Sequence, residues 1–318
     1  MTRYHAGMSS PLWSWLRSLP RAGASARHDR QVADELNWRQ SHDQGRAPTL
    51  PEGLELQWLG TAGFRLSYEG TTLLIDPYAT RVPLAKVLGR ARVSPDLSRI
   101  DRHLPRADYV LIGHSHFDHA MDAPVIARRD GCTVYGSRSM ATLMRAHGLA
   151  AQAVEVELFH AYELGPFRVT FVPSVHSKLV LGLRIPYAGD ITCEHTDGSL
   201  ACSAYKCGQV YGIHVEVAGF SIYHQGSADL IDEAIRHRGV DLFLVGISGR
   251  AFTRDYASRI LRLLQPRWVL PHHHDNFFQG LDRPMRFSFN VNLYGFTTEV
   301  AAVSREFELV TLDLLQTA

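Results

Sequence analysis

The pattern of hydrophobic and polar positions is most regular after Leu54, where short alternating segments are separated by turns that contain glycine. A period of two places one face of a strand in the core and the other face outside. We therefore expect an antiparallel meander of strands at Leu54–Leu59, Phe64–Tyr68 and Thr71–Ile75. Asp108–Gly113 is almost wholly apolar, which predicts a strand that is buried on both faces.

The rest of the chain alternates strand-like and helix-like segments. We expect further strands at Phe167–Val172, Val215–Tyr223, Leu242–Val245 and Trp268–Leu270. Helical periodicity, caps and breakers predict helices at Ser137–His147, Ala228–Arg238 and Tyr256–Leu264. Strands dominate the first part and strand–helix alternation the last, so the expected fold class is α/β, with helices on the outer faces of sheets.

Residues 1–50 differ from the rest, because they are rich in arginine and contain few β-branched residues. We expect them to form an N-terminal arm beside a main domain of residues 51–318. Within the arm, Pro11–Leu19 carries Trp13 and Trp15 and can form a short amphipathic helix. Two interpretations stay open: the arm binds a membrane surface or a partner, or its tryptophans pack on the main domain.

Composition limits the classes of function. Hydrophobic residues make up 45% of the chain and charged residues 20%, which is typical of a globular protein with a substantial core. The net charge of +1 gives no field that would attract nucleic acid. Four cysteines are too few for a disulfide scaffold, and neither a long apolar run nor a secretory signal is apparent, so we expect a cytoplasmic protein. A homo-oligomer remains an open alternative.

Histidine is unusually frequent, at 17 residues, and the run His114-Ser115-His116-Phe117-Asp118-His119 is the main candidate for chemistry. His114 and His116 follow a predicted strand two positions apart, so an extended chain directs both rings to one side. Asp118 and His119 come next, where a turn into a helix aims them at a neighbouring point. Imidazole and carboxylate groups are the donors that zinc prefers. The run therefore predicts part of a metal site.

Further ligands have to come from other segments. His176 and His273 each follow a predicted strand, in VPSVHS and LPHHHD. Strand ends are where α/β sheets place ligand sites. We expect both histidines to join the first cluster.

The order of these motifs resembles the metallo-β-lactamase fold superfamily: Gly60-Thr61-Ala62-Gly63 between two strands, then Leu74-Ile75-Asp76-Pro77, the HxHxDH run, and distant single histidines. Trp58-Leu59-Gly60, the Asp76-Pro77 step and Pro271–Phe277 are similar to the branch that contains ascorbate-6-phosphate lactonase-like enzymes. More distantly they resemble relatives of the N-acyl-phosphatidylethanolamine phospholipase D enzymes. The resemblance covers about residues 54–310.

The resemblance implies an αββα sandwich, in which two mixed sheets carry helices on their outer faces. It also implies one metal at His114, His116 and His176 and a second at Asp118, His119 and His273. His272 and His274 would then lie behind the ligands or in the wall of the site, where they can orient ligands by hydrogen bonds. Zinc is the expected cofactor, as one or two ions, with manganese or iron as alternatives.

The chain departs from that family at one position. The aspartate that bridges the two metals corresponds to Ser227, and a neutral hydroxyl is a poor substitute for a carboxylate. Asp229 either reaches the site instead or caps a helix that begins there. The second metal is therefore expected to bind weakly, or the site to be mononuclear.

Residues 190–208 carry Cys193, His195, Cys202 and Cys207. A structural metal knuckle is one interpretation, but the spacing is not a known one. We expect an insertion at the rim of the active site that influences substrate choice.

These observations predict a metal-dependent hydrolase of a small molecule. A metal-activated water would attack a lactone, ester, amide or phosphodiester, with Asp118 as the catalytic carboxylate. The alternative is a non-catalytic or ligand-sensing descendant with a partial metal site. Iron-based redox chemistry is weaker, because iron favours carboxylates and this chain has lost one.

Overall fold

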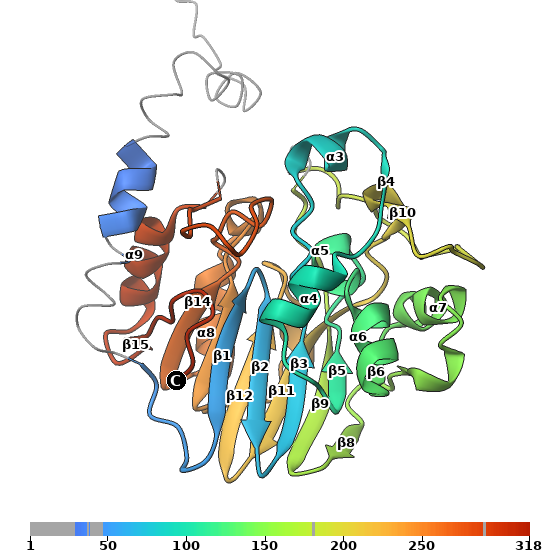
Figure 1. Cartoon of the computed structure of the whole chain (residues 1–318). Helices are drawn as coiled ribbons and strands as arrows, with labels where there is room; N and C mark the ends of the chain where they lie inside the picture. The colour runs from blue at the N-terminus through green and yellow to red at the C-terminus, as the bar shows by residue number, and fades with distance from the viewer. Residues whose placement is uncertain (1–28, 37, 39–46, 180–181, 289–290) are drawn as a thin grey trace, which may run out of the picture.

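Two β-sheets lie face to face in the computed structural model, with helices on their outer sides (Figure 1). The structure describes residues 29–36, 38, 47–179, 182–288 and 291–318. The first sheet has the strand order β1-β2-β3-β5-β6-β7, and the second has the order β15-β14-β13-β12-β11-β9-β8. This arrangement is the predicted αββα sandwich.

The first sheet begins with the expected antiparallel meander and continues with parallel strands. Its strands are β1 (Glu55–Gly60), β2 (Gly63–Tyr68), β3 (Thr71–Ile75), β5 (Tyr109–Leu111), β6 (Thr133–Gly136) and β7 (Ala153–Glu155). The helices in this half are α3 (Leu84–Leu88), α4 (Leu97–His103), α5 (Phe117–Ala120), α6 (Ala123–Asp130) and α7 (Arg138–Ala146). The helix predicted after Ser137 is confirmed, and the Ser137 hydroxyl caps it by accepting from the Met140 N–H.

The second sheet is mixed: β8 to β12 pair antiparallel, and β12 to β15 pair parallel. Its strands are β8 (Ala161–Leu164), β9 (Phe167–Ser174), β11 (Val210–Val217), β12 (Phe220–Gln225), β13 (Leu242–Gly246), β14 (Trp268–His272) and β15 (Glu308–Leu309). Helices α8 (Tyr256–Leu264) and α9 (Leu293–Val303) pack against each other beside this sheet (Figure 1).

Alternation along the strands determines which layer each side chain joins. Leu73 and Ile75 of β3 point into the core between the sheets, whereas Leu74 packs in the layer between the first sheet and its helices. Val110 of β5 lies in the helix layer, and its neighbour Leu111 lies between the sheets. Both faces of β5 are buried, as its apolar sequence predicted.

Two sequence-based expectations were wrong. The segment predicted as one strand from Val215 to Tyr223 is a hairpin of β11 and β12, because Ala218 and Gly219 both adopt positive φ and form a tight turn. The predicted helix Ala228–Arg238 is absent, and only a short 3₁₀ turn at Asp232–Ala234 forms there. Arg259 of α8 holds the Asp232 carboxylate at 2.7 Å, so tertiary contacts override the local helical pattern.

The expected rim insertion pairs with a loop of the first half of the chain. β4 (Arg92–Val93) and β10 (Leu200–Ala201) form a two-stranded sheet, which joins residues 78–103 to the insertion near 190–208. Short 3₁₀ turns occupy Ala150–Gln152, Cys202–Ala204 and Arg250–Phe252. In Figure 1 the sheet of β4 and β10 lies beside α3, above one end of the two large sheets.

The N-terminal residues that the structure describes contact the main domain. Trp38 lies 4.9 Å from His274 and 6.2 Å from Trp58, measured between ring centroids, and its indole N–H donates to Asp313. Trp13 and Trp15 lie outside the described residues, so the division into arm and main domain stays a prediction. Among the described helices, none is long and apolar enough to cross a membrane.

A stacked pair of histidines, His214 of β11 and His237, predicts acid sensitivity. His214 lies 3.7 Å from His237, and burial followed by the charge of His237 lowers the pKa of His214 to about 3. Between this pKa and the usual value of about 6.5, the unfolded chain binds more protons at His214 than the folded protein does. The contribution of His214 to the free energy of unfolding is therefore fully present above about pH 6.5 and is lost as the pH falls toward 3. We expect a loss of about 1–2 kcal/mol from this residue between pH 7 and pH 5. Urea unfolding at both pH values tests this: His214→Phe should lose less stability than wild type, and an equal loss would contradict it.

Candidate metal centre

Side chains that follow three strands meet at one edge of the two sheets. His114 and His116 follow β5, and α5 begins immediately afterwards and carries Asp118 and His119. His176 lies two residues beyond β9, and His273 follows β14 directly. All of the predicted site residues are therefore brought together, and all are buried.

The first cluster consists of three histidines. One ring nitrogen from each of His114, His116 and His176 lies within 4.8 Å of the others. The Nε2 atom of His114 faces the Nδ1 atom of His116 at 3.0 Å. Two imidazole nitrogens at this separation, both turned inward, have the placement of two ligands of one ion.

The second cluster consists of Asp118, His119 and His273, whose donor atoms also lie within 4.8 Å of one another. The Asp118 carboxylate is 3.4 Å from His273 Nε2 and 3.8 Å from His119 Nε2. The two clusters are adjacent, because the rings of His114 and His119 lie 3.8 Å apart, centroid to centroid.

The outer ring nitrogens of His116 and His176 are anchored in a way that fits a metal ion. His116 Nε2 lies 2.8 Å from the Pro186 carbonyl, and His176 Nδ1 lies 2.8 Å from the Ser177 carbonyl. A ring that donates its outer N–H to an oxygen has its lone pair on the inner nitrogen. The inner atoms converge on common points, which is the arrangement a dication requires.

Electrostatics favours the same protonation states. Burial lowers the pKa of His116 to about 4, although the charge of Asp118 opposes the shift, and burial with the charge of His116 lowers the pKa of His176 to about 3, so both are neutral at pH 7. Burial opposes ionisation of Asp118, yet His119 and His273 hold its pKa below the usual range. Neutral imidazoles beside an ionised carboxylate are the forms that bind a metal.

Asp76, which sequence reasoning did not place in the site, supports His119. Its Oδ2 lies 2.8 Å from His119 Nδ1, and its Oδ1 accepts from the Gly113 N–H at 2.7 Å. A carboxylate behind a ligating histidine fixes ring orientation and raises ligand basicity. The available signal was a lone acidic residue directly after an apolar strand.

Replacing Asp76 by asparagine is expected to weaken metal binding at the second cluster by roughly 10–100-fold, because an amide cannot accept from both His119 and Gly113. Competition with a chelator measures the dissociation constants, and the exposed Asp101→Asn serves as the control. Unchanged metal affinity in Asp76→Asn would contradict the role assigned to this carboxylate.

His273 has a positive φ, and a hydrogen bond to the turn between β1 and β2 holds it in this conformation. Its N–H donates to the Thr61 carbonyl at 2.9 Å, and the Thr61 N–H donates to Asp275 at 2.8 Å. Arg81, which is 1% exposed, pairs with Asp275 at 2.6 Å. A Cβ at Gly60 would lie 1.8 Å from Arg81, so only glycine leaves room for this buried pair.

The expectation that His272 and His274 orient ligands by hydrogen bonds is wrong for the residues that the structure describes. His272 stacks on His224 at 5.0 Å with an interplanar angle of 5°. His274 packs against Trp38 and Trp58. Both rings are fully buried among other aromatic side chains.

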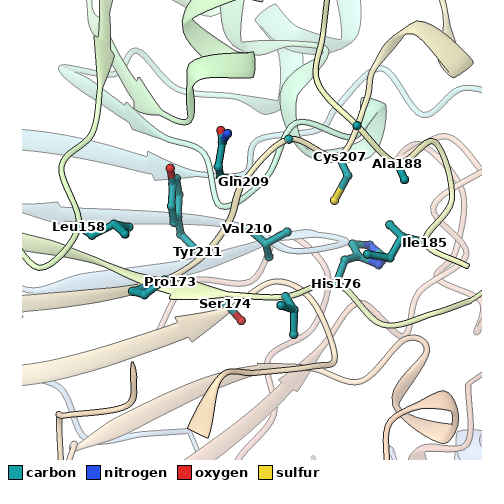
Figure 2. A pocket seen from close by; sticks show the side chains of 13 residues that line it. Leu158, Pro173, Ser174, His176, Ile185, Ala188, Cys207, Gln209, Val210 and Tyr211 are labelled. Atoms are coloured by element: carbon teal, nitrogen blue, oxygen red, sulfur yellow. The ribbon is translucent and has the colours of Figure 1, made fainter. Parts of the chain in front are cut away.

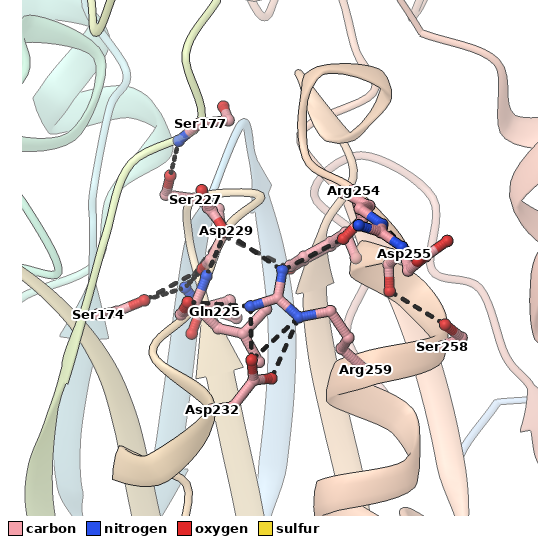
Figure 3. Close-up of polar contacts among 12 residues, drawn as sticks. Ser174, Ser177, Gln225, Ser227, Asp229, Asp232, Arg254, Asp255, Ser258 and Arg259 are labelled. Atoms are coloured by element: carbon pink, nitrogen blue, oxygen red, sulfur yellow. Dashed lines mark hydrogen bonds and ion pairs between the residues drawn. The ribbon is translucent and has the colours of Figure 1, made fainter.

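Asp229 neither replaces the missing bridge nor begins a helix. Its carboxylate accepts from the Leu230 N–H at 2.9 Å and lies 3.8 Å from Arg259, turned toward α8 (Figure 3). The Ser227 hydroxyl accepts from the Ser177 N–H at 3.3 Å. No cysteine belongs to a metal-capable cluster in the described part of the chain, and the rim insertion stays a prediction.

The fold and these clusters define a class: an αββα protein with a histidine- and aspartate-lined metal centre at the edge between its sheets. Residues 55–273 match the beta-lactamase superfamily domain. The chain therefore belongs to this superfamily, which confirms the resemblance at that level; the narrower branch stays a prediction.

Curated relatives are named for the same chemistry. The chain is 28% identical over 232 residues to a UPF0173 metal-dependent hydrolase of Carboxydothermus hydrogenoformans, covering 70% of this chain and 86% of the relative. It is 29% identical over 228 residues to one of Thermus thermophilus, covering 70% and 85%. These names support a metal-dependent hydrolase and leave the substrate unspecified.

Solved structures share the fold. Igni18, a metallo hydrolase of Ignicoccus hospitalis, superposes with a TM-score of 0.56 at 18% identity and covers 83% of this chain and 97% of its own. CmlA, a diiron beta-hydroxylase of Streptomyces venezuelae, gives 0.55 at 17% identity, covering 85% and 54%. At these identities the two structures show only that the fold is shared, and this fold is the predicted αββα sandwich.

Proposed function

We propose that this chain hydrolyses a small ester-like molecule at a centre where His114, His116 and His176 hold one metal ion. The observation that carries the proposal is the convergence of ring nitrogens from His114, His116 and His176, with the outer nitrogens of His116 and His176 anchored to backbone carbonyls. A dication in such a site lowers the pKa of water to about 7 and polarises the bond under attack. Three histidines suit zinc, with manganese or iron as alternatives.

Asp118 is the proposed catalytic carboxylate. Its Oδ2 lies between the Nε2 atoms of His119 and His273, 3.8 and 3.4 Å away, at the boundary of the two clusters. As a carboxylate it accepts a hydrogen bond from the attacking water and orients it, and it carries the proton onward to the leaving group. No serine or cysteine nucleophile is required.

The number of ions depends on Ser227. Its hydroxyl faces the Ser177 backbone in place of a bridging carboxylate (Figure 3). We expect one tightly bound ion at the three histidines and weak binding at Asp118, His119 and His273.

Replacing Ser227 by aspartate is expected to raise metal content from about one to about two equivalents, because a carboxylate binds a hard dication far better than a hydroxyl. Metal analysis after extensive dialysis measures the ratio, with Ser227→Ala as the matched control. The same content in wild type and Ser227→Asp would contradict the assignment of this position.

A panel of lactones, esters, amides and phosphodiesters tests the hydrolase itself. The lost carboxylate at Ser227 is the observation that favours the alternative, a ligand-sensing descendant. Less than about half an equivalent of metal in the purified protein would support that alternative and overturn the hydrolase. A cytoplasmic location, a membrane-binding arm and a homo-oligomer stay predictions.

A further inference from the structure

An elongated pocket of about 300 Å³ lies directly beside the first metal cluster. His176 and Ile185 lie at one end of it, and Leu158 and Tyr211 at the other (Figure 2). Its volume is at the lower end of the range for small-molecule sites. His176 is thus both a proposed metal ligand and a wall of the pocket.

The lining of this pocket carries no charged side chain at neutral pH. Burial raises the pKa of the Cys207 thiol and of the Tyr211 phenol to about 12 each, so both are neutral. The Ser174 hydroxyl is already occupied, since it donates to the Asp229 carbonyl and accepts from Gln225. A phosphate or carboxylate would lose its hydration here without gaining a cation, whereas an alkyl chain would gain from burial. The remaining lining residues are Pro173, Val175, Ala188, Gly189, Gly208, Gln209 and Val210.

The pocket is fixed relative to the metal ligands by backbone hydrogen bonds. The Ser115 N–H, between His114 and His116, donates to the Cys207 carbonyl at 3.0 Å. The Tyr211 N–H donates to the Gly113 carbonyl at 2.8 Å, and the Pro186 carbonyl faces His116 Nε2. The rim insertion is therefore attached to the loop that carries His114 and His116. A preformed pocket binds its ligand without the conformational entropy cost of ordering its lining.

We propose that this pocket receives the hydrocarbon chain of the substrate's acyl group, which places the carbonyl carbon beside the metal centre. This inference rests on the hydrolase function proposed above, and it narrows the substrate class to uncharged acyl esters, lactones or amides with an alkyl chain. The acyl chain extends from His176 toward Leu158.

The first test is a series of p-nitrophenyl esters from acetyl to dodecanoyl. We expect kcat/KM to rise about threefold to fourfold per methylene group until the chain reaches Leu158, and then to level off. Leu158→Trp shortens the pocket, so the ratio of kcat/KM for the octanoyl ester to that for the acetyl ester should fall at least tenfold. The matched control is Leu97→Trp, at a position that is 60% exposed on α4, and it should leave the ratio unchanged.

The second test measures binding without hydrolysis. Calorimetric titration of the purified protein with 1-alkanols from butanol to dodecanol should show affinity that rises with chain length, with an earlier plateau in Leu158→Trp. Chain-length-dependent alkanol binding without cleavage of any ester would uphold the pocket and reject the ester substrate. The opposite result is ester cleavage whose kcat/KM, like the alkanol affinity, depends neither on chain length nor on the Leu158→Trp substitution. It would contradict the acyl-chain pocket and leave the proposed hydrolase function supported.

Discussion

His116→Ala is expected to lose its bound metal and to lower kcat/KM by more than about a thousandfold, for whichever substrate of the panel is cleaved. The Nδ1 atom of His116 lies 3.0 Å from His114 Nε2, and the two form one cluster with His176. Removing one of three nitrogen donors leaves too few protein ligands to hold an ion against water. Metal content and turnover are measured on the same preparation.

The control for this prediction is His160→Ala, since His160 is an exposed histidine outside the metal-capable clusters of the described residues. It should keep both metal and activity. Hydrolysis that survives in His116→Ala would show that another site, or a contaminant, is responsible. Loss of activity in both variants would point to a general effect on the fold.

Arg81→Met is expected to destabilise the protein by about 3–5 kcal/mol, because it leaves the Asp275 carboxylate buried without its cation. The pair lies at 2.6 Å, with side chains that are 1% and 3% exposed. Asp275 also accepts from the Thr61 N–H, and the Thr61 carbonyl accepts from the His273 N–H. The substitution should therefore also disturb the conformation of His273, a proposed metal ligand. Metal affinity at the second cluster should fall as well.

The control for this prediction is Arg65→Met. Arg65 pairs with Glu55 at 2.8 Å, but Glu55 is 54% exposed, so the expected cost is at most about 1 kcal/mol. Urea unfolding at pH 7 measures both variants. Equal losses from Arg81→Met and Arg65→Met would refute a special role for the buried pair.

Periodicity identified the strands of the first sheet well, because one face of each strand has to be apolar whatever it packs against. It failed at Ala228–Arg238, where the local pattern is helical but Arg259 and its partner Asp232 hold the segment in another conformation. It also missed the turn at Ala218-Gly219, because a hairpin between two apolar strands looks like one long strand.

The proposed ligand residues could be selected from the sequence because metal binding demands particular side chains at strand ends. His114, His116, Asp118 and His119 are neighbours in sequence, so their proximity needed no knowledge of the fold. Asp76 could not be placed in the same way. Its contact with His119 spans 43 positions and depends on the parallel pairing of β3 with β5.

By itself the sequence determined the fold class, the meander and the six residues that form the two clusters, because hydrophobic period and donor chemistry are local properties of the chain. Only the tertiary structure decided that Asp76 supports His119, that Asp229 turns toward Arg259, and that His272 and His274 pack without orienting a ligand. It also decided that an uncharged pocket adjoins His176. Each of these contacts depends on which distant segments lie together at the edge of the two sheets. The pairing of the strands determines which segments those are.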